Sequence, residues 1–248
     1  MQSDNKPIKD WKKILIDTSI ICALFRAQYT TSDDTTLFIN KLINYLSNSK
    51  SGDKSERTFL ISTITLTELL TKEQDEEKIK RIVKVLHSNN VQFISFDTNT
   101  ALEFNHSMAP YLHKTQLHKK AAEVGFVTGD YMLAREWISK DYMIALSGVV
   151  KNADVILTAD KNTFYPVCQD VNGANCVLTY PSLFSYSEQY FFDYDYGNVD
   201  NFLKNIPFKT FNEIEESKPK AGVQNELFSN EENTGNGIRI ETDPEEGF

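Results

Sequence analysis

The sequence predicts an α/β fold with three layers, α/β/α, around a central parallel sheet. Short apolar runs that suit buried strands recur along the chain, at 14–16, 58–62 and 154–157. Between them the apolar residues follow helical spacing. Strands that alternate with helices form parallel sheets covered on both faces, because each connection has to cross over the sheet.

Length and composition favour one α/β domain with additions. The chain has 248 residues, of which 25% are charged and 40% hydrophobic, as in globular proteins. No apolar run approaches the ~20 residues of a membrane helix, and residues 1–10 form a polar, flexible start without a signal region. We therefore expect a cytoplasmic protein without membrane contact. The three cysteines are too few for a disulfide framework.

The first strand is expected at 14–16, and Asp17 follows it at once. Thr18 and Ser19 come next, and both residue types favour the start of a helix, here expected over 18–28. In open α/β sheets, ligands bind in the crevice outside the carboxyl ends of the strands. Asp17 is therefore expected either to cap this helix or to take part in chemistry.

The strand and helix pattern then repeats twice. Asp33 or Asp34 is expected to cap the second helix, and Asp97 the helix that follows the third strand. In order, the expected elements are a helix over 35–47, an exposed turn over 48–57, a strand over 58–62, helices over 63–70 and 72–87, a strand over 91–96 and a helix over 98–113.

The pattern loosens into an insertion at about 106–140, which holds a helical piece over 130–138. Asp141 is expected to open the helix that leads to the fourth strand at 154–157, and a fifth strand is expected at 176–179. The main domain is thus expected to span 11–183, with an aromatic extension over 184–211.

The rest of the chain, 212–248, is expected to be a disordered acidic tail. It holds ten acidic and three basic residues, so it carries about seven of the nine net negative charges. The remaining domain is nearly neutral. Net charge therefore does not exclude a nucleic-acid partner, because phosphate contacts are local.

Four acidic residues fall near strand ends or at the helices beside them. The carboxyl ends of parallel strands meet at one edge of the sheet, so acids far apart in sequence converge there. Crowded carboxylates repel one another unless a cation lies among them, and Mg²⁺ or Mn²⁺ prefers oxygen ligands. The sequence therefore predicts a metal site formed by Asp17, Glu68, Asp141 and Asp160.

These motifs, in this order, resemble the PIN-domain nucleases, particularly the ribonuclease toxins of bacterial toxin–antitoxin pairs. The resemblance covers about 14–183 and rests on ILIDTSIICALF, STITLTELL, DYMIALSGVV and NADVILTADKNTF. It implies a PIN-like fold and a metal-dependent endoribonuclease, toxin-like or a defence effector. An RNA substrate is implied as well, and an antitoxin-like partner or a homo-oligomer stays open.

Within this resemblance, Asp17, Asp141 and Asp160 would hold Mg²⁺ or Mn²⁺, and Glu68 would bind a second ion or orient the attacking water. Ser19 and Thr158 would support the carboxylates through hydrogen bonds, although both also suit helix caps or turns. Asp130, which opens DYMLAREWI, is a rival to Asp141 as the third acid.

Two other functions stay open: a non-catalytic PIN-like module that binds RNA or protein, and a nuclease that acts on structured DNA. His106, His113 and His118 lack the spacing of a helical metal site, and the first two are expected to share a helical face. Lys114, Lys119 and Lys120 form a basic run that either faces solvent or guides phosphates. Aromatic residues of 184–196 suit packing better than base stacking, because acids lie among them.

Overall fold

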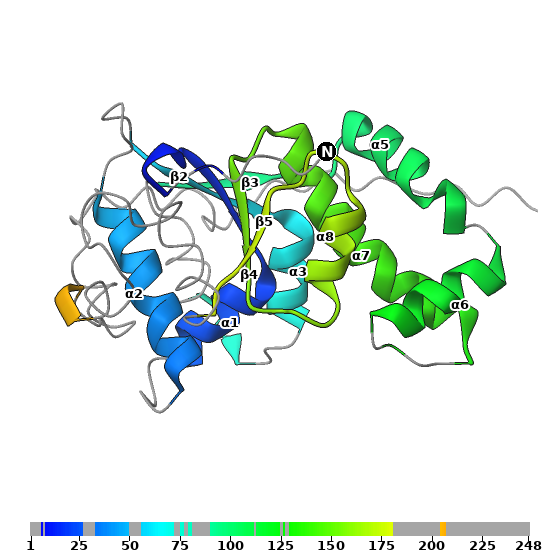
Figure 1. Cartoon of the computed structure of the whole chain (residues 1–248), viewed down its shortest axis with the longest axis horizontal. Helices are drawn as coiled ribbons and strands as arrows, with labels where there is room; N and C mark the ends of the chain where they lie inside the picture. Colours follow the sequence, from blue (N-terminus) through cyan, green and yellow to red (C-terminus); the bar gives the residue numbers. More distant parts are fainter. Residues whose placement is uncertain are drawn as a thin grey trace, which may run out of the picture. The chain divides into compact units, whose positions relative to one another are not determined.

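A parallel sheet forms the centre of the fold (Figure 1). The computed structural model describes residues 6, 8–26, 33–49, 56–71, 75–76, 79–80, 90–111, 113–124, 126, 129–180 and 204–206. Within these residues the sheet has five strands: β1 (Lys13–Ile16), β2 (Thr58–Ser62), β3 (Val91–Ile94), β4 (Val155–Thr158) and β5 (Cys176–Leu178).

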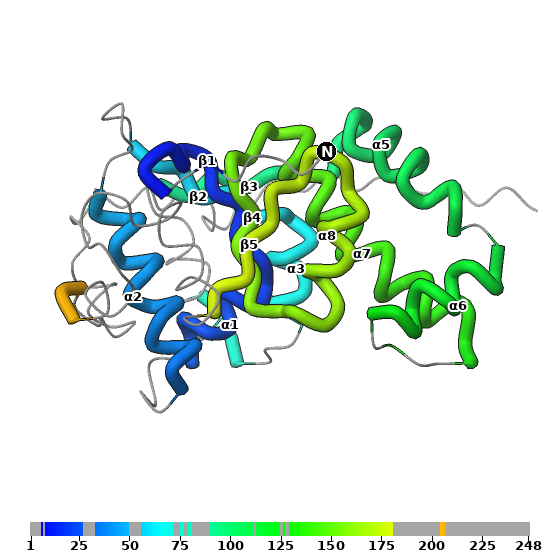
Figure 2. Tube along the Cα trace, viewed as in Figure 1, coloured from blue at the N-terminus to red at the C-terminus, as the bar shows by residue number. Residues whose placement is uncertain are grey.

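The strand order is β3-β2-β1-β4-β5, and every neighbouring pair is parallel (Figure 2). In β1, Ile14 pairs with Phe59 of β2 on one side and with Val155 of β4 on the other. The chain thus builds outward from β1 in one direction and later returns to add β4 and β5 in the other. The crevice at such a switch point, between the carboxyl ends of β1 and β4, is where open α/β sheets bind ligands.

Helices cover both faces of the sheet. They are α1 (Thr18–Arg26), α2 (Asp34–Asn48), α3 (Thr63–Thr71), α5 (Thr98–Met108), α6 (Lys114–Glu123), α7 (Tyr131–Val150) and α8 (Phe164–Asp170), with short 3₁₀ turns η1 (Ile8–Asp10) and η2 (Ala109–Tyr111).

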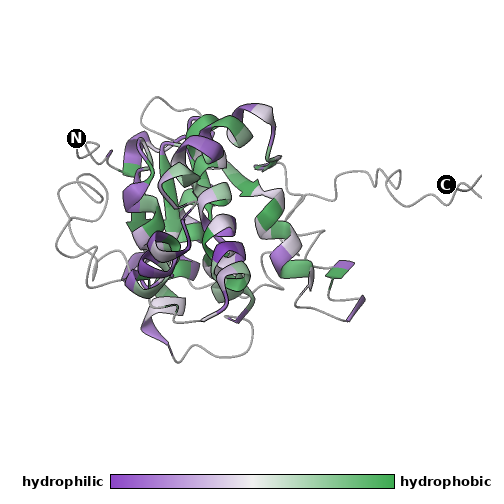
Figure 3. Cartoon of the chain, turned by 90° about the vertical axis from the view of Figure 1, so that its right-hand side faces the viewer, coloured by the Kyte–Doolittle hydropathy of each residue, from purple (hydrophilic) through white to green (hydrophobic). Residues whose placement is uncertain are grey.

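Alternation of side chains along the strands separates two apolar clusters. Ile14 and Ile16 pack with α1 and α2 on one face, whereas Leu15 packs with α7 and α8 on the other. Figure 3 shows the apolar strands enclosed between these helices. The predicted three-layer α/β class with a central parallel sheet is confirmed.

Helix α7 lies very close to the sheet at Gly148. A Cβ atom at this position would lie 2.7 Å from Cδ2 of Leu15 in β1, so a larger residue would require the Leu15 side chain to shift. Since α7 leads back to the start of β4, its earlier turns lie toward the carboxyl ends of the strands. The close packing at Gly148 therefore fixes where Asp141, seven residues before it, meets the switch point.

The prediction that Asp141 opens a helix is wrong, because α7 is one continuous helix of 20 residues that begins at Tyr131. Its buried face runs without a break through Ala134, Ile138, Tyr142 and Ala145, a spacing of three or four residues. The expected helical piece over 130–138 is the first half of this same helix.

The prediction that His106 and His113 share a helical face is also wrong. Helix α5 ends at Met108, η2 follows, and His113 lies just before α6. Helices α6 and α8 were not predicted as separate elements. The expected caps Asp33 and Asp97 are confirmed, since their carboxylates accept hydrogen bonds from the first turns of α2 and α5.

Some predictions concern parts of the chain outside the described residues. These parts include most of the expected helix over 72–87, the tail over 212–248 and the aromatic extension except for 204–206. Within the expected flexible start, Ile8 is buried in the core. No helix in the described part of the chain has the length and apolarity required to cross a membrane.

A buried arginine ties the beginning of the chain to the first layer. Arg57, just before β2, is 2% exposed. It donates hydrogen bonds to the carbonyl oxygens of Ile8 at 3.2 Å, Trp11 at 3.0 Å and Ser49 at 2.6 Å. Its guanidinium also lies over the ring of Tyr45. One side chain thus donates to three backbone carbonyl groups in two segments of the chain, 8–11 and the end of α2.

Candidate active site

Asp17 lies at the carboxyl end of the central strand and is only 5% exposed. Its N–H donates to the carbonyl of Leu157 in β4 at 3.1 Å, and its own carbonyl accepts from Ile20 in the first turn of α1. Burial raises the pKa of the Asp17 carboxyl, although hydrogen bonds from Ser19 and Thr158 oppose this rise. Capping a helix does not require such burial.

Two hydroxyl groups hold the Asp17 carboxylate. Its Oδ2 accepts from Ser19 Oγ at 2.7 Å and from Thr158 Oγ1 at 2.9 Å. The same hydroxyls accept N–H groups of the loop after β4, Ser19 from Ala159 and Thr158 from Asp160, both at 2.9 Å. The orientation of Asp17 is therefore coupled to the loop that carries Asp160.

Glu68 lies half-buried on α3. Its Oε2 accepts a hydrogen bond from Thr18 Oγ1 at 2.6 Å, which joins the first residue of α1 to α3. From the sequence, Thr18 is expected only to favour the start of a helix, and it is not among the predicted site residues. The available signal is a hydroxyl residue directly after the first carboxylate, in the first turn of a helix.

Asp160 forms a tight turn that leads into α8. Its Oδ1 accepts from the N–H groups of Asn162 and Thr163 at 2.9 Å, and its Oδ2 accepts from the Thr163 hydroxyl. This turn by itself accounts for an aspartate at position 160. Thr163 also hydrogen-bonds Asp141, so it links two of the predicted acids. It too was missed, although a Thr three residues after an Asp is typical of such turns.

Asp141 lies in the middle of α7 and faces the other three acids. Burial raises the pKa of its carboxyl well above the usual value of 3.8, and the charges of Asp17, Asp160 and Glu68 raise it further. The hydrogen bond from Thr163 acts in the opposite direction. The structure thus brings the other three predicted acids within electrostatic reach of Asp141 at the switch point.

Asp130, the rival third acid, lies elsewhere. It is exposed at the start of α7, where its Oδ1 accepts from the N–H groups of Met132 at 2.8 Å and Leu133 at 3.2 Å. This is an ordinary helix cap. Asp141 lies three turns further along the helix.

The donor set suits a hard divalent cation, because it consists of carboxylates whose mutual repulsion a cation would relieve. Among the described residues, however, no three His, Cys, Asp or Glu side chains lie close enough together to hold one metal ion. Mg²⁺ commonly binds one or two carboxylates and completes its shell with water and substrate oxygens. The four carboxylates fit this mode, and their individual roles as ligands stay predictions.

The basic run of α6 is not a uniformly solvent-facing surface. Lys120 is 7% exposed and forms an ion pair with Asp170 at the end of α8. Tyr142 of α7 donates to the same carboxylate oxygen at 3.0 Å. Lys120 lies in this network because it follows Leu117 by three residues and so shares the face of α6 that packs against α7. Lys120 therefore neither faces solvent nor is available to guide phosphates, which were the two roles expected for the basic run.

The carboxylate cluster leads to a prediction about the metal-free protein. The raised pKa values of Asp141 and Asp17 mean that the folded state binds more protons than the unfolded chain above the usual value of 3.8. Stability should therefore fall as the pH rises from 3.8 through these raised values. Asp33, Asp97 and Asp154, whose pKa values are lowered, stabilise the fold at pH values above 3.8, and they make stability depend on pH only below 3.8, where that contribution is lost as the pH falls.

Thermal unfolding in chelator at a series of pH values tests this prediction. Asp141→Asn should reduce the slope of melting temperature against pH, whereas Asp130→Asn should keep it. An equal slope in all three proteins would mean that the Asp141 carboxyl does not titrate abnormally.

No family model matches the chain, and no curated protein matches it. Among solved structures, it is similar to the crystal structure of VapBC2 from Rickettsia felis bound to a DNA fragment from their promoter. That match has a TM-score of 0.39 and 15% identity, over 67% of this chain and 98% of that chain. It is also similar to DNA-bound VapBC from Salmonella typhimurium, with a TM-score of 0.37 and 19% identity, over 68% of this chain and 99% of that chain.

These two structures are toxin–antitoxin complexes whose VapC component is a PIN-domain nuclease. At these identities the likeness concerns the fold alone.

Proposed function

We propose that this chain is a cytoplasmic, metal-dependent endoribonuclease that hydrolyses RNA phosphodiester bonds at the carboxylate cluster. The observation that carries the proposal is the position of Asp141. Its side chain is half-buried at the switch point of a parallel sheet, where burial and the charges of Asp17, Asp160 and Glu68 raise the pKa of its carboxyl. A domain that only had to be stable would gain nothing from four acids there, because burying like charges costs free energy.

Each of the predicted site residues would have its own role in this reaction. Asp17, Asp141 and Asp160 would hold Mg²⁺ or Mn²⁺, with one or two of these carboxylates bound directly and the rest through metal-bound water, and Glu68 would orient water or a second ion. A bound cation would activate a water molecule and neutralise the charge that develops on the phosphodiester. Ser19 and Thr158 keep Asp17 oriented through the hydrogen bonds described above, and Thr18 does the same for Glu68. The motifs' resemblance to toxins adds an antitoxin-like protein partner to the proposal.

The decisive experiment is to incubate the full-length protein with mixed RNAs and with DNAs, in Mg²⁺, in Mn²⁺ and in chelator. The proposal expects metal-dependent cleavage of RNA at internal phosphodiester bonds, rather than release of single nucleotides from the ends of the strand. Cleavage of structured DNA in place of RNA would support the alternative substrate. Binding without cleavage in either metal would support a non-catalytic module.

The two rival acids give a separate prediction. Asp141→Asn should weaken Mn²⁺ binding by about 10- to 100-fold or more, the loss that even an outer-shell partner of a metal causes. Asp130→Asn should leave binding nearly unchanged, because Asn also caps helices well. Isothermal titration calorimetry measures both variants against the unmodified chain. The reverse result would place the third ligand at the start of α7.

A further inference from the structure

The first half of α7 carries exposed apolar side chains that the core does not use. Of the described residues, Met132, Leu133 and Trp137 are 65%, 42% and 50% exposed. Figure 1 shows why: this part of α7 extends beyond the sheet toward α6, so the sheet no longer covers it. Leaving half of a tryptophan side chain exposed keeps apolar ring surface in contact with water, which is unfavourable for the free energy of folding.

Trp137 is held in place by a second aromatic ring. Phe126 stacks on it, with ring centroids 4.6 Å apart and planes inclined by only 17°. One face of the indole is thus covered and the ring is fixed, while half of the side chain stays open to solvent. A flat, fixed aromatic face that still reaches solvent can stack a planar ligand at low entropic cost.

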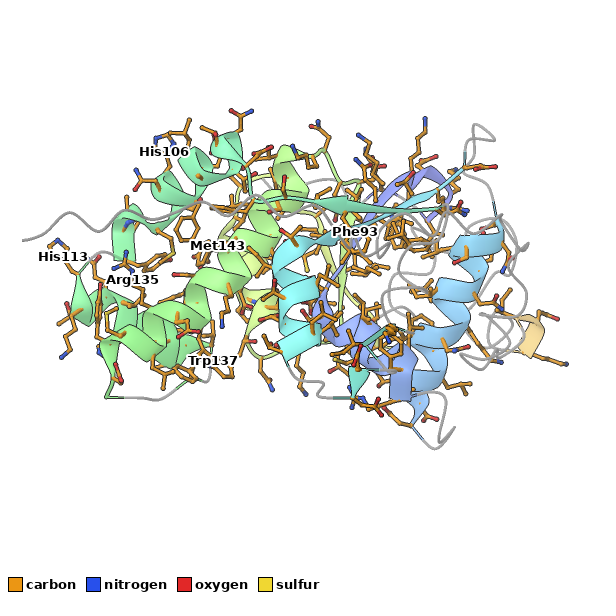
Figure 4. All side chains as sticks on the ribbon, turned by 180° about the vertical axis from the view of Figure 1, so that it is seen from behind. Phe93, His106, His113, Arg135, Trp137 and Met143 are labelled. Carbon is orange, nitrogen blue, oxygen red and sulfur yellow. The ribbon has the colours of Figure 1, made fainter. Side chains whose placement is uncertain are left out.

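The position of Trp137 relative to the candidate active site suggests which ligand this is. Trp137 precedes Asp141 by four residues, so the two side chains lie on nearly the same face of α7, about 6 Å apart along the axis. That rise is less than two base steps of a nucleic-acid strand, at roughly 3.4 Å each. In Figure 4, Trp137 and Arg135 point to opposite sides of α7.

We propose that Trp137, supported by Phe126, is a stacking platform for an unpaired base of the nucleic-acid strand whose phosphodiester lies at the four carboxylates. This inference rests on the proposed function and adds a preference for single-stranded substrate. In a duplex, both faces of each internal base are already stacked, whereas an unpaired base can leave its neighbours and bind an aromatic side chain.

A protein partner fits this surface less well. A stable protein interface involves about 20–30 residues on each side. Within the described residues of α7, the large apolar side chains that are exposed are only three: Leu133 and Trp137, four residues apart on one face, and Met132 on another side. The base-stacking role requires one aromatic face beside the site of cleavage, which Trp137 provides.

The test uses tryptophan fluorescence of the full-length protein. The chain has two tryptophans, and Trp11 is completely buried, so quenching by a bound strand reports on Trp137. Asp17→Asn is introduced so that the strand is not cut. A short single-stranded oligoadenylate is the probe. It should quench the emission and protect Trp137 from acrylamide, whereas an abasic strand of equal length and the matching duplex should do so much less.

Variants at the platform sharpen the result. Trp137→Ala should weaken oligoadenylate binding by about 5- to 150-fold, and Trp137→Phe should retain most of the affinity. Met132→Ala is the matched control, since it removes an apolar side chain that is even more exposed but lies on another side of α7. Its affinity should be unchanged.

The platform is refuted if the strand does not quench, if Trp137→Ala binds as tightly as the control, or if Trp137→Leu binds as tightly as the unmodified ring. The last result would indicate an apolar contact of the kind a protein partner makes. Failure of the proposed function is a different outcome: the strand then still binds and quenches, but the chain with Asp17 intact cuts no RNA. Conversely, cleavage with an unchanged KM in Trp137→Ala refutes the platform and keeps the nuclease.

Discussion

Asp17→Asn should lower the rate of RNA cleavage by more than about 100-fold while leaving the fold intact. The loss of activity follows from removing one charged ligand of the proposed cation, which costs more than the 10- to 100-fold loss seen for outer-shell partners. The fold should persist because Asn keeps an oxygen that can accept from Ser19 and Thr158. Single-turnover cleavage in Mg²⁺ and thermal unfolding in chelator measure the two effects.

The melting temperature of this variant in chelator should equal or exceed that of the unmodified chain. Burial penalises the ionised form of Asp17, and Asp141 experiences its charge, so a neutral side chain removes two unfavourable interactions. Asp33→Asn is the control, because it makes the same change in an exposed cap and should alter neither activity nor stability greatly. If Asp17→Asn lost activity together with its folded structure, Asp17 would be a structural cap.

Arg57→Ala should destabilise the protein by about 3–5 kcal/mol, the largest effect on stability that we expect from a single substitution. The change removes the guanidinium donor from the carbonyl groups of Trp11 and Ser49, at about 1–3 kcal/mol for each group that stays buried, whereas the Ile8 carbonyl keeps the N–H of Trp11 as a donor. Melting temperature should fall by roughly 6–20 °C, since each kcal/mol corresponds to about 2–4 °C in a chain of this size.

Arg57→Lys separates charge from geometry. Lysine keeps the positive charge but not the planar fork that reaches several carbonyl groups at once, so it should recover only part of the lost stability. Urea unfolding of the three proteins at one pH gives the comparison. A loss below about 1 kcal/mol in Arg57→Ala would mean that water replaces the guanidinium at these carbonyl groups.

The strands could be predicted closely from the sequence. All five lie where apolar runs predict them, with differences of one or two residues at their ends. The reason is physical: a strand buried on both faces needs a continuous apolar run, and polar residues end it. Parallel order followed from the alternation with helices. The position of β1 between β2 and β4, however, depends on long-range pairing that no local pattern encodes.

The helices beyond β3 were harder to predict. Asp141 resembles the start of a helix because aspartate favours caps, yet it lies inside α7, where its charge serves no capping role. Helix α8 was missed because it is short and contains Pro166, which is acceptable only because it lies in the first turn, where no N–H partner is needed.

The four candidate acids were predicted from their order near strand ends, because the carboxyl ends of parallel strands lie at the same edge of the sheet. Thr18 and Thr163 could not be singled out in the same way, because threonine is common in turns and caps. Their importance depends on which carboxylates lie opposite them, and that follows only from the packing of α3 and α7 against the sheet. The structure is therefore needed to identify which hydroxyl groups bond to the acids.

The hydrogen bond between Thr158 and Asp17 joins residues 141 positions apart, and the pairing of β1 with β4 spans the same length of chain. Contacts of this kind raise the contact order of a domain. Such a domain folds slowly, because the chain must close a long loop before β4 can pair with β1. During synthesis at about 5–20 residues per second, roughly 7–28 s pass between the addition of Asp17 and that of Thr158, and the carboxylate cluster is incomplete until Asp160 follows. A chain that is truncated before β4, or cut by a protease between β3 and α7 and then separated, retains Asp17 and Glu68 but not the assembled site.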